Sequence, residues 1–316
     1  MTGCAGFIGS NVLKYILNKK NFSVIGIDNL STGKIQHIQP YLDNANFFFH
    51  NLDLKNLDKL KSIAFNNVDI IIHLAANADV RFGLEHPAKD LEENTLVTFN
   101  LLEIARINKI KRFAFSSTGS IYGEPDVIPT PEDAPFPIQT SLYGASKLAC
   151  EGLIQAYAEG YGIRAFIFRF VSIMGPHYSH GHVYDFYRQL LQDPSRLHLL
   201  GDGNQRKSYL HVSDCISAIF MIIEKAKDNI NIYNLGVDDT CTVKQSANWI
   251  SEHLSLTPTL TFEGGDRGWV GDNPYIHLSV EKLKTLGWVN QYSIEESVKD
   301  TVKYLELNQW ILDSAK

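Results

Sequence analysis

The chain opens with Thr2-Gly3-Cys4-Ala5-Gly6-Phe7-Ile8-Gly9, which leads directly into the helical pattern Ser10–Lys19. The glycines at positions 3, 6 and 9 predict a Gly-x-x-Gly-x-x-Gly turn. Such a turn lets backbone N–H groups approach a pyrophosphate at the N-terminus of the following helix. The segment therefore predicts a dinucleotide site at the start of an α/β fold.

An acidic residue stands where such a site needs one. Asp28 lies 19 residues after Gly9, at the end of the next predicted strand. A carboxylate there binds the ribose hydroxyls of an adenosine and repels a 2′-phosphate, so NAD is favoured over NADP. A purely turn-forming role in Asp28-Asn29-Leu30 is the alternative, and the three glycines weigh against it.

The first half of the chain alternates short apolar runs with helical patterns, which is typical of a doubly wound parallel sheet. We expect a Rossmann domain over residues 1–171, with residues 213–240 returning to it. The strand before the glycine turn is almost absent, because only Met1 and Thr2 precede Gly3. Either the true start lies upstream or that strand is built from very little. The strands predicted are Ser23–Ile27, Ala45–His50, Asp69–Leu74, Arg112–Ser116 and Arg164–Phe170, and the helices are Ser10–Lys19, Leu57–Asn66, Leu91–Ile107 and Leu142–Glu159.

After Phe170 the rhythm changes, which predicts a smaller C-terminal α/β substrate lobe over residues 172–212 and 241–316. We expect short strands around Gly201–Asp202 and Ser208–Val212, and one more strand of the main sheet at Ile230–Leu235. The helices predicted here are Tyr184–Gln192, Val243–Leu254, Val280–Leu286 and Ile294–Leu305.

Bulk composition is that of a soluble globular enzyme, with 44% hydrophobic and 20% charged residues. The formal charge of −6 argues against a nucleic-acid partner. No apolar run reaches the ~18 residues that a membrane-spanning helix needs. The four cysteines are widely spaced, which fits a reducing compartment, and we expect a cytoplasmic location.

A candidate proton-transfer pair lies in Tyr143-Gly144-Ala145-Ser146-Lys147, where a phenol and an ammonium share one face of a helix. A nearby cation favours the phenolate and lowers the pKa of a tyrosine, which is otherwise near 10. Ser116, Ser117 and Thr118 form a hydroxyl cluster at the carboxyl end of an apolar strand. Ligands of open α/β sheets bind at that edge.

Taken together, these segments resemble the extended short-chain dehydrogenase/reductase family, in its NAD-dependent epimerase/dehydratase branch of UDP-galactose 4-epimerase-like enzymes. The resemblance is carried by Thr2–Ser10, Asp28–Gly33, Phe115–Gly123, Tyr143–Lys147 and Arg206–Asp214. It implies an enzyme with NAD as cofactor and no metal. A non-catalytic NAD-binding sensor is the less favoured alternative, because the catalytic trio is intact.

The resemblance also implies roles for individual residues. Tyr143 is the implied general base, Lys147 its electrostatic partner, and Thr118 the hydroxyl that bonds the substrate oxygen. Asp53 and Leu54 would frame the adenine. The implied NAD-binding residues are Gly3, Gly6, Phe7, Ile8, Gly9, Asp28, Asn29, Ser31, Thr32, Gly33, Asp53, Leu54, Leu74, Ala75, Ala76, Asn94, Ser116, Tyr143, Lys147 and Val171.

The two residues after Thr118 bear on the reaction. Relatives that dehydrate nucleotide sugars carry a carboxylate there, whereas this chain has Gly119 and Ser120. The resemblance thus implies a UDP-hexose 4-epimerase that works through a transient 4-keto sugar. A dehydratase, or an epimerase acting at another carbon, stays open, and Glu124 is the alternative acid.

The substrate is expected to be a nucleotide sugar, with UDP favoured. Thr118, Tyr143, Ser172, Arg206, Arg267 and Asp272 are the implied substrate-binding residues, with Arg206 on the diphosphate. Three positions depart from the family pattern. Ser172 replaces an asparagine, Trp269 replaces an arginine, and Ile276 occupies a position that sizes the sugar pocket.

Two further features stay open at this stage. His177-x-x-His180-x-His182 has short spacing that can chelate zinc, but the family uses no metal, so a substrate or structural role is favoured. The helices Leu91–Ile107 and Leu142–Glu159 resemble those that pair across the family's homodimer. Their apolar residues serve either the core or that interface, namely Leu96, Phe99, Leu102, Leu148 and Ile154.

Overall fold

The computed structural model describes residues 1–19, 21–77, 85–136, 138–269 and 272–313. The chain divides into two compact units. Unit 1 comprises Met1–Gly123, Pro135–Phe170 and Ile219–Tyr233. Unit 2 comprises Glu124–Ala134, Val171–Ala218 and Asn234–Lys316.

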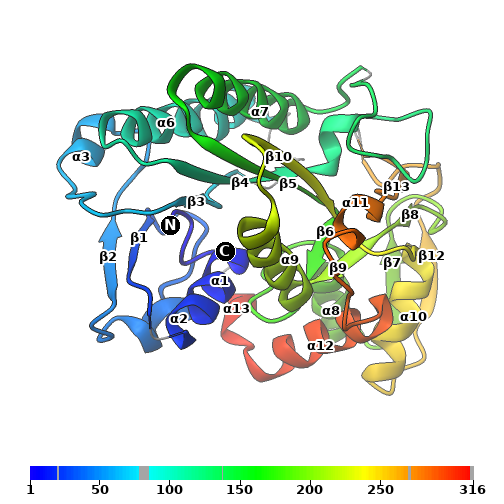
Figure 1. Cartoon of the computed structure of the whole chain (residues 1–316). Coiled ribbons are helices and arrows are strands. Elements are labelled where there is room, and N and C mark those ends of the chain that lie inside the picture. Colours follow the sequence, from blue (N-terminus) through cyan, green and yellow to red (C-terminus); the bar gives the residue numbers. More distant parts are fainter. Residues whose placement is uncertain (20, 78–84, 137, 270–271, 314–316) are drawn as a thin grey trace. The chain divides into compact units, whose positions relative to one another are not determined.

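Unit 1 is built around a parallel sheet, so the predicted α/β fold class is confirmed (Figure 1). Strands β3 (Ile71–His73), β4 (Arg112–Thr118) and β5 (Arg164–Phe170) pair in parallel, and β10 (Ile230–Leu235) is the other neighbour of β5. A second parallel pair joins β1 (Val24–Asp28) to β2 (Phe47–Asn51). The strands β5 and β10 have the bounds that the sequence predicted.

The short segment Met1–Gly3 joins these two sets of strands. Thr2 forms parallel bridges with Ile27 of β1 and with His73 of β3. Its N–H bonds the Ile72 carbonyl at 3.0 Å, and the Gly3 N–H bonds the Ile27 carbonyl at 2.9 Å. A segment too short to count as a strand thus occupies the central position, which gives the order β2-β1-Thr2-β3-β4-β5-β10.

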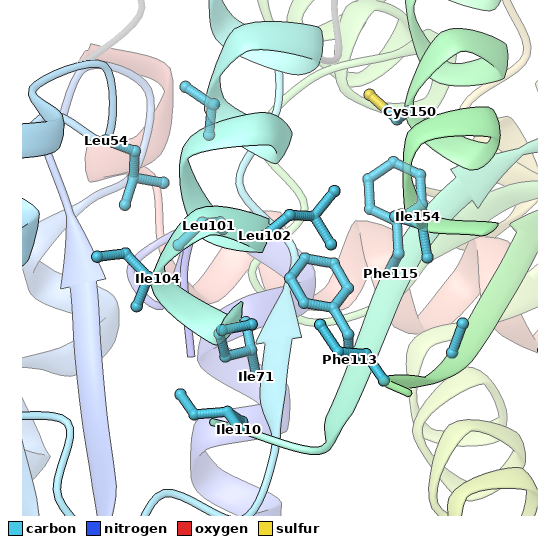
Figure 2. Close-up of a cluster of buried hydrophobic side chains, with 14 of the residues drawn as sticks. Leu54, Ile71, Leu101, Leu102, Ile104, Ile110, Phe113, Phe115, Cys150 and Ile154 are labelled. Atoms are coloured by element: carbon cyan, nitrogen blue, oxygen red, sulfur yellow. The ribbon is translucent and has the colours of Figure 1, made fainter. Parts of the chain in front are cut away.

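Helices α6 (Val97–Ile107) and α7 (Leu142–Tyr161) cover one face of this sheet, and α1 (Phe7–Asn18) lies on the other (Figure 1). Figure 2 shows the core beneath α6 and α7, where strand aromatics meet helix aliphatics. Phe113 and Phe115 of β4 are fully buried there, because β4 is covered on this face. Leu102 and Ile154, each 1% exposed, belong to this core.

Helix ends in unit 1 follow local chemistry. Ser141 caps α7 by accepting the Gly144 N–H at 3.0 Å, and Gly162 ends the helix at φ +64°. The helix predicted over residues 57–66 is shorter in the structure, where α3 (Leu57–Lys61) ends at Lys61. The helix predicted over residues 91–107 begins as a π-helix, η2 (Leu91–Leu96). The short elements are α2 (Ile35–Ile38), η1 (Gln39–Tyr41), α5 (Pro87–Asp90) and η3 (Gly119–Tyr122).

Among its described residues, unit 2 contains three small sheets and several helices. β6 (Ser172–Met174) pairs with β9 (Tyr209–His211), β7 (Arg196–Leu199) with β12 (Thr259–Phe262), and β8 (Arg206–Lys207) with both β11 (Cys241–Thr242) and β13 (Tyr275–Ile276). Its helices are α8 (His182–Gln192), α10 (Val243–His253), α11 (Glu281–Lys284), α12 (Ile294–Leu307) and α13 (Trp310–Asp313).

One expectation for the second half needs correction, and one helix there was not expected. The strand predicted around Gly201–Asp202 is wrong: these residues form a turn, with Gly201 at φ +70° and Gly203 at φ +79°, backbone angles that strands do not use. The sequence analysis also did not predict α9 (Val212–Lys225), which runs from unit 2 into unit 1. Among the described helices, none is both long and apolar enough to span a bilayer.

Candidate active site

The glycine turn is packed too tightly for side chains at two of its three glycines. A Cβ on Gly9 would lie 1.9 Å from the Gly3 carbonyl oxygen, and one on Gly3 would lie 2.7 Å from the Ala75 nitrogen. Gly3 also has φ +68°. Gly6 precedes the first residue of α1, and no side chain caps the helix there. The N-terminus of α1 therefore offers its amide dipoles to an anion, as a pyrophosphate requires.

Asp28 braces this turn from the end of β1. Its two carboxylate oxygens accept the N–H groups of Ala5 and Leu30, each at 2.9 Å. The side chain is 8% exposed, and burial raises its pKa. Gly33 lies against it, because a Cβ there would be 2.8 Å from the carboxylate. Each carboxylate oxygen keeps a second lone pair, so the brace is compatible with ribose binding.

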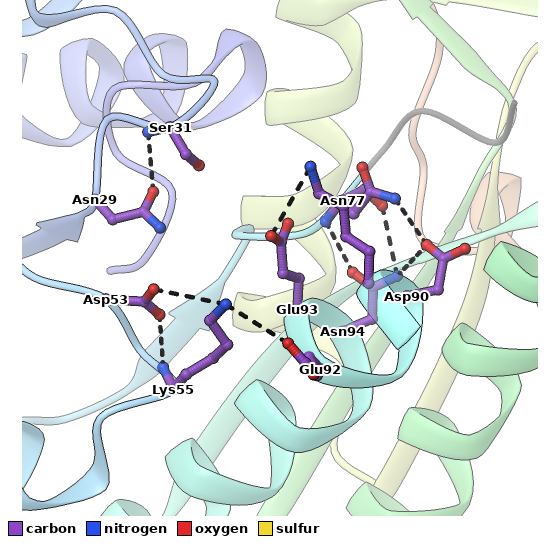
Figure 3. Close-up of polar contacts among 10 residues, drawn as sticks. Asn29, Ser31, Asp53, Lys55, Asn77, Asp90, Glu92, Glu93 and Asn94 are labelled. Carbon is purple, nitrogen blue, oxygen red and sulfur yellow. Dashed lines mark hydrogen bonds and ion pairs between the residues drawn. The ribbon is translucent and has the colours of Figure 1, made fainter. Parts of the chain in front are cut away.

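The other residues expected around the adenosine lie on neighbouring loops (Figure 3). Asn29 accepts the Ser31 N–H at 3.0 Å, and Thr32 is exposed beside them. Asp53 accepts the Lys55 N–H at 2.9 Å, and its side chain stays 45% exposed. The side chain of Asn100 on α6 donates to the Leu54 carbonyl at 2.9 Å, and this bond fixes the backbone that follows β2.

A buried imidazole ties the start of the chain to α6. His73 is 0% exposed; its Nδ1 lies 2.8 Å from the Thr2 hydroxyl and its Nε2 3.1 Å from the Thr98 hydroxyl. Thr98 donates to the Asn94 carbonyl at 2.7 Å, so Nε2 carries the proton and Thr2 donates to Nδ1. Thr2 in turn accepts the Ala75 N–H at 3.3 Å. Burial lowers the pKa of His73 well below its usual value, so the ring is neutral. This chain of bonds fixes the backbone of Leu74–Ala76, where the nicotinamide side of the cofactor was expected.

Asn94 is the centre of a second buried cluster (Figure 3). Its amide oxygen accepts the Asn77 N–H at 2.9 Å, and its amide nitrogen donates to the Ser146 hydroxyl at 2.9 Å. Asp90, 1% exposed, accepts from the Asn77 side chain at 2.9 Å. The sequence identified Asn94 but missed these three partners, which come from three separate segments.

The proposed catalytic hydroxyls meet in unit 1. The Thr118 hydroxyl at the end of β4 lies near the phenol of Tyr143 on α7 and favours its ionised form. Lys147, 2% exposed, donates to the Ser116 carbonyl at 2.8 Å, and its Nζ lies 4.6 Å from the centre of the Phe115 ring. The three residues that the resemblance singled out therefore come from one strand end and one helix face.

Their pKa values differ from the sequence expectation. Burial raises the pKa of the half-buried Tyr143 to about 12, although the nearby Thr118 hydroxyl opposes the shift. Burial lowers the pKa of Lys147 to about 8. The predicted lowering of the phenol pKa by Lys147 is therefore wrong for the protein alone. Desolvation is the largest cause of the raised phenol pKa, and the Lys147 ammonium is bonded to the Ser116 carbonyl instead.

The residues after Thr118 carry no acid. Gly119 is buried, and the N–H and hydroxyl of Ser120 both contact the Thr118 hydroxyl, at 3.1 and 3.2 Å. Glu124, the alternative acid, belongs to unit 2 and forms an ion pair with Arg267 at 2.7 Å. The Glu124 carboxylate is thus already engaged by a guanidinium of its own unit.

In unit 2 the cation nearest Asp272 is Lys207, which the sequence analysis missed. Arg206, the predicted diphosphate ligand, is exposed on β8. Lys207 follows it with a side chain only 12% exposed, and its Nζ lies 2.6 Å from Asp272 and 4.8 Å from the centre of the Trp269 ring. Adjacent residues of a strand point to opposite faces, which explains why Arg206 is exposed and Lys207 is not. The same alternation could have distinguished the two side chains from the sequence alone. Arg267 donates to the Asp272 carbonyl at 2.9 Å.

The remaining predicted positions lie elsewhere in unit 2. Ser172 is exposed on β6, and Val171 before it is buried, with its N–H bonded to the Leu235 carbonyl at 3.0 Å. Ile276 is partly exposed on β13, in register with Lys207.

The three histidines of the predicted loop have separate surroundings. The His177 ring contacts Tyr304 at a tilt, with 5.4 Å between ring centres. His180 stacks on Tyr178 at 6.0 Å. His182 lies 2.8 Å from the Ser246 hydroxyl, and burial lowers its pKa to about 3. Within the described residues, no three His, Cys, Asp or Glu side chains form a group that could hold a metal.

Comparisons with known proteins show related sequences and structures. The model of the NAD dependent epimerase/dehydratase family matches residues 1–236. A putative UDP-glucose 4-epimerase of Methanocaldococcus jannaschii is 31% identical over 314 residues, 98% of each chain. A crystal structure of a UDP-galactose 4-epimerase is 34% identical, with a TM-score of 0.87 over 98% of each chain. A UDP-glucuronic acid 4-epimerase from Bacillus cereus, solved with UDP-glucuronic acid and NAD, is 27% identical, with a TM-score of 0.88 over 97% of this chain and 98% of that one. Dehydratases of nucleotide sugars are among the more distant matches.

Proposed function

The chain belongs to the NAD dependent epimerase/dehydratase family, and from that premise we propose that it is an NAD-dependent UDP-hexose 4-epimerase. The observation that carries the proposal is the nearness of the Thr118 hydroxyl to the phenol of Tyr143, beside a buried Lys147 and with no carboxylate at Gly119 or Ser120. Such a site moves one proton on a sugar hydroxyl and has no acid with which to expel a second hydroxyl.

The residues of unit 1 fit NAD. Gly3, Gly6 and Gly9 leave the N-terminus of α1 uncovered for a pyrophosphate, and Asp28 suits an unphosphorylated ribose. NAD held by these residues would supply the reversible hydride acceptor that epimerisation at the sugar C4 needs. Because the cycle is redox-neutral, we expect NAD to remain bound between turnovers.

The protein groups supply the proton transfer. Tyr143 would take the proton of the sugar 4-hydroxyl and later return it, while Thr118 orients that hydroxyl. The protein alone holds the phenol neutral, because burial raises its pKa to about 12. Lys147 anchors the site through its bond to Ser116.

A UDP-hexose is the proposed substrate. The relatives named above act on UDP-glucose, UDP-galactose or UDP-glucuronic acid. In unit 2, Lys207, Arg206 and Arg267 are the candidate partners of a diphosphate. Ile276 is smaller than an aromatic residue, which supports tolerance of a 2-acetamido group.

Proton NMR of the protein incubated with UDP-glucose or UDP-N-acetylglucosamine tests the reaction. A C4 stereoisomer of unchanged mass is expected. A product lighter by one water would replace the proposal with a dehydratase, which was the alternative left by the sequence. A stereoisomer at another carbon would keep the enzyme class and change the site of reaction.

We also propose a homodimer formed through η2, α6 and α7. Leu102 and Ile154 serve the core, whereas Leu91, Leu96 and Phe99 are 61%, 42% and 38% exposed. An apolar row of this kind on one helix supports a protein interface. The four cysteines are free and buried, which supports a reducing, cytoplasmic location.

A further inference from the structure

The face of α7 that carries the catalytic pair continues one turn further. Tyr143, Lys147 and Glu151 are spaced by four residues and so share this face. Lys147 bonds the Ser116 carbonyl at 2.8 Å, and Glu151 accepts the Ser117 hydroxyl at 2.5 Å. Consecutive residues at the end of β4 are therefore each tied to this one helix face.

Glu151 is also one half of a fully buried ion pair. It is 0% exposed, and Arg169 of β5 is 2% exposed. The guanidinium donates twice, from Nε at 3.1 Å and from Nη2 at 2.7 Å. Its third nitrogen donates to the Tyr122 hydroxyl at 2.6 Å, and its centre lies 5.1 Å from the centre of the Phe136 ring. The pair thus joins α7, β4, β5 and η3.

Stability alone does not account for this arrangement. Removing two charges from water is expensive, and replacing a buried ion pair by apolar residues of similar size is often neutral or stabilising. What a well-bonded pair adds is a fixed geometry. Glu151 accepts three hydrogen bonds, two from Arg169 and one from Ser117, so neither its position nor that of the β4 end can drift.

The titratable groups around Lys147 come from several elements. Glu151 and Cys150 lie on its own helix, Asp90 on α5, and the neutral His73 on β3. Glu151 and Asp90 both favour the ammonium, against the burial that lowers its pKa to about 8. Arg169 reduces the effect of Glu151 on the pKa of Lys147, because its guanidinium neutralises that carboxylate.

We propose that Glu151 is a positioning residue for the reaction. Anchored by Arg169, it fixes the end of β4 through Ser117 and, from the next turn of α7, stabilises the charge on Lys147. It touches neither substrate nor cofactor. The inference rests on the proposed function, since it assigns Glu151 a part in the work of Thr118, Tyr143 and Lys147.

Two substitutions that remove charges of opposite sign test the role proposed for Glu151. Glu151→Gln removes the negative charge and Arg169→Met removes the positive one, with side-chain size roughly kept. ¹³C NMR of labelled lysine, with Lys147 assigned through Lys147→Arg, should show the Lys147 midpoint moving to lower pH in Glu151→Gln and to higher pH in Arg169→Met. We expect kcat of Glu151→Gln to fall about 10- to 100-fold with KM unchanged. Its rate should also decline at a lower pH than in the wild type.

Two variants guard against simple misfolding. Ser117→Ala breaks only the link to β4 and should lower kcat several-fold without moving the Lys147 midpoint. Glu103→Gln is the matched control, because Glu103 on α6 also accepts two bonds from an arginine, Arg106, and one from a tyrosine, Tyr157. It should change neither kcat nor the Lys147 midpoint.

A merely structural role gives a different pattern. Glu151→Gln and Arg169→Met would then both lose thermal stability with the Lys147 midpoint unmoved, and the double variant Glu151→Gln/Arg169→Met would recover full kcat. That result would overturn the inference. If the wild type turns over no UDP-hexose, the proposed function fails instead, and the NMR titration still decides whether Glu151 controls Lys147.

Discussion

The hydroxyl of Thr2 lies 2.8 Å from Nδ1 of His73. This contact connects the short segment Met1–Gly3 to an imidazole that also reaches helix α6. Thr2 is the sole bridge residue between β1 and β3 within the described chain. Its backbone can form few ladder hydrogen bonds, so the side-chain bond to a buried imidazole adds to them. The same imidazole reaches Thr98 on α6, and hence the backbone of Asn94.

We predict that this contact makes folding sensitive to acid. The folded pKa of His73 is well below its unfolded value near 6.5, so below pH ~6.5 the unfolded chain binds more protons. The free energy of unfolding should therefore fall as the pH drops from 7 to 5. Urea denaturation of the wild type and of His73→Gln at both pH values checks this. His73→Gln should lose about 1–3 kcal/mol at pH 7 and show a smaller loss on acidification. Equal pH slopes in the two proteins would contradict the prediction.

Much of unit 1 could be predicted from sequence because its signals are local. β5 and β10 have the predicted bounds, since apolar runs covered on both sides leave little ambiguity. The turn at Gly201–Asp202 was misread as a strand, because periodicity carries no information on positive φ. Asn94 was identified, but Asn77 and Asp90 were not, since polar clusters assembled from distant segments leave no spacing pattern. Glu151 could have been found, because it repeats the four-residue step from Tyr143 to Lys147.

The glycine turn gives a prediction with a control on another helix. Gly9→Ala would place a methyl group 1.9 Å from the Gly3 carbonyl, which the turn cannot accept without moving. We expect loss of co-purifying NAD, measured by chromatography after denaturation, and a lower thermal midpoint. Gly160→Ala on α7 meets no atom within 4 Å. It should keep its NAD and gain about 0.4–1 kcal/mol in stability. NAD retained at wild-type level by Gly9→Ala would contradict the reading of the turn.

Tyr143→Phe should lower kcat by about 10²–10⁴-fold while bound NAD and thermal stability stay near wild type. The phenyl ring keeps the packing and loses only the hydroxyl that lies near Thr118. In the wild type, the rate should decline above pH ~8, because Lys147 is charged below its pKa of about 8 and neutral above it. Steady-state kinetics from pH 6 to 10 measure both effects. Near-normal turnover by the phenylalanine variant would assign the proton transfer to another group.

The proposed dimer can be tested at one exposed ring. Phe99 on α6 is 38% exposed and does not belong to the buried core, which contains Leu102. Phe99→Glu should convert a dimer to a monomer by placing like charges across a two-fold interface. Size-exclusion chromatography with light scattering gives the mass of both proteins. Ile138→Glu, at a residue 89% exposed and on no helix, is the control and should not change the mass. A wild-type monomer would refute the proposal directly.

Diphosphate binding should depend more on Lys207 than on Arg206. Lys207 is the less exposed cation, held between Asp272 at 2.6 Å and the Trp269 ring at 4.8 Å, whereas Arg206 is exposed on the other face of the same strand. A partly desolvated charge binds an anion more strongly than the same charge surrounded by water. Losing a charged donor typically removes about 1.5–3 kcal/mol, or roughly ten- to 150-fold in affinity. Lys207→Met should therefore weaken UDP binding by a factor in that range, measured by calorimetry, and Arg206→Met by much less. Trp269→Leu serves as a second variant, because it keeps the charge of Lys207 and removes only the ring beneath it. If Arg206→Met has the larger effect, the arginine named from the sequence is the ligand, and Lys207 only neutralises Asp272.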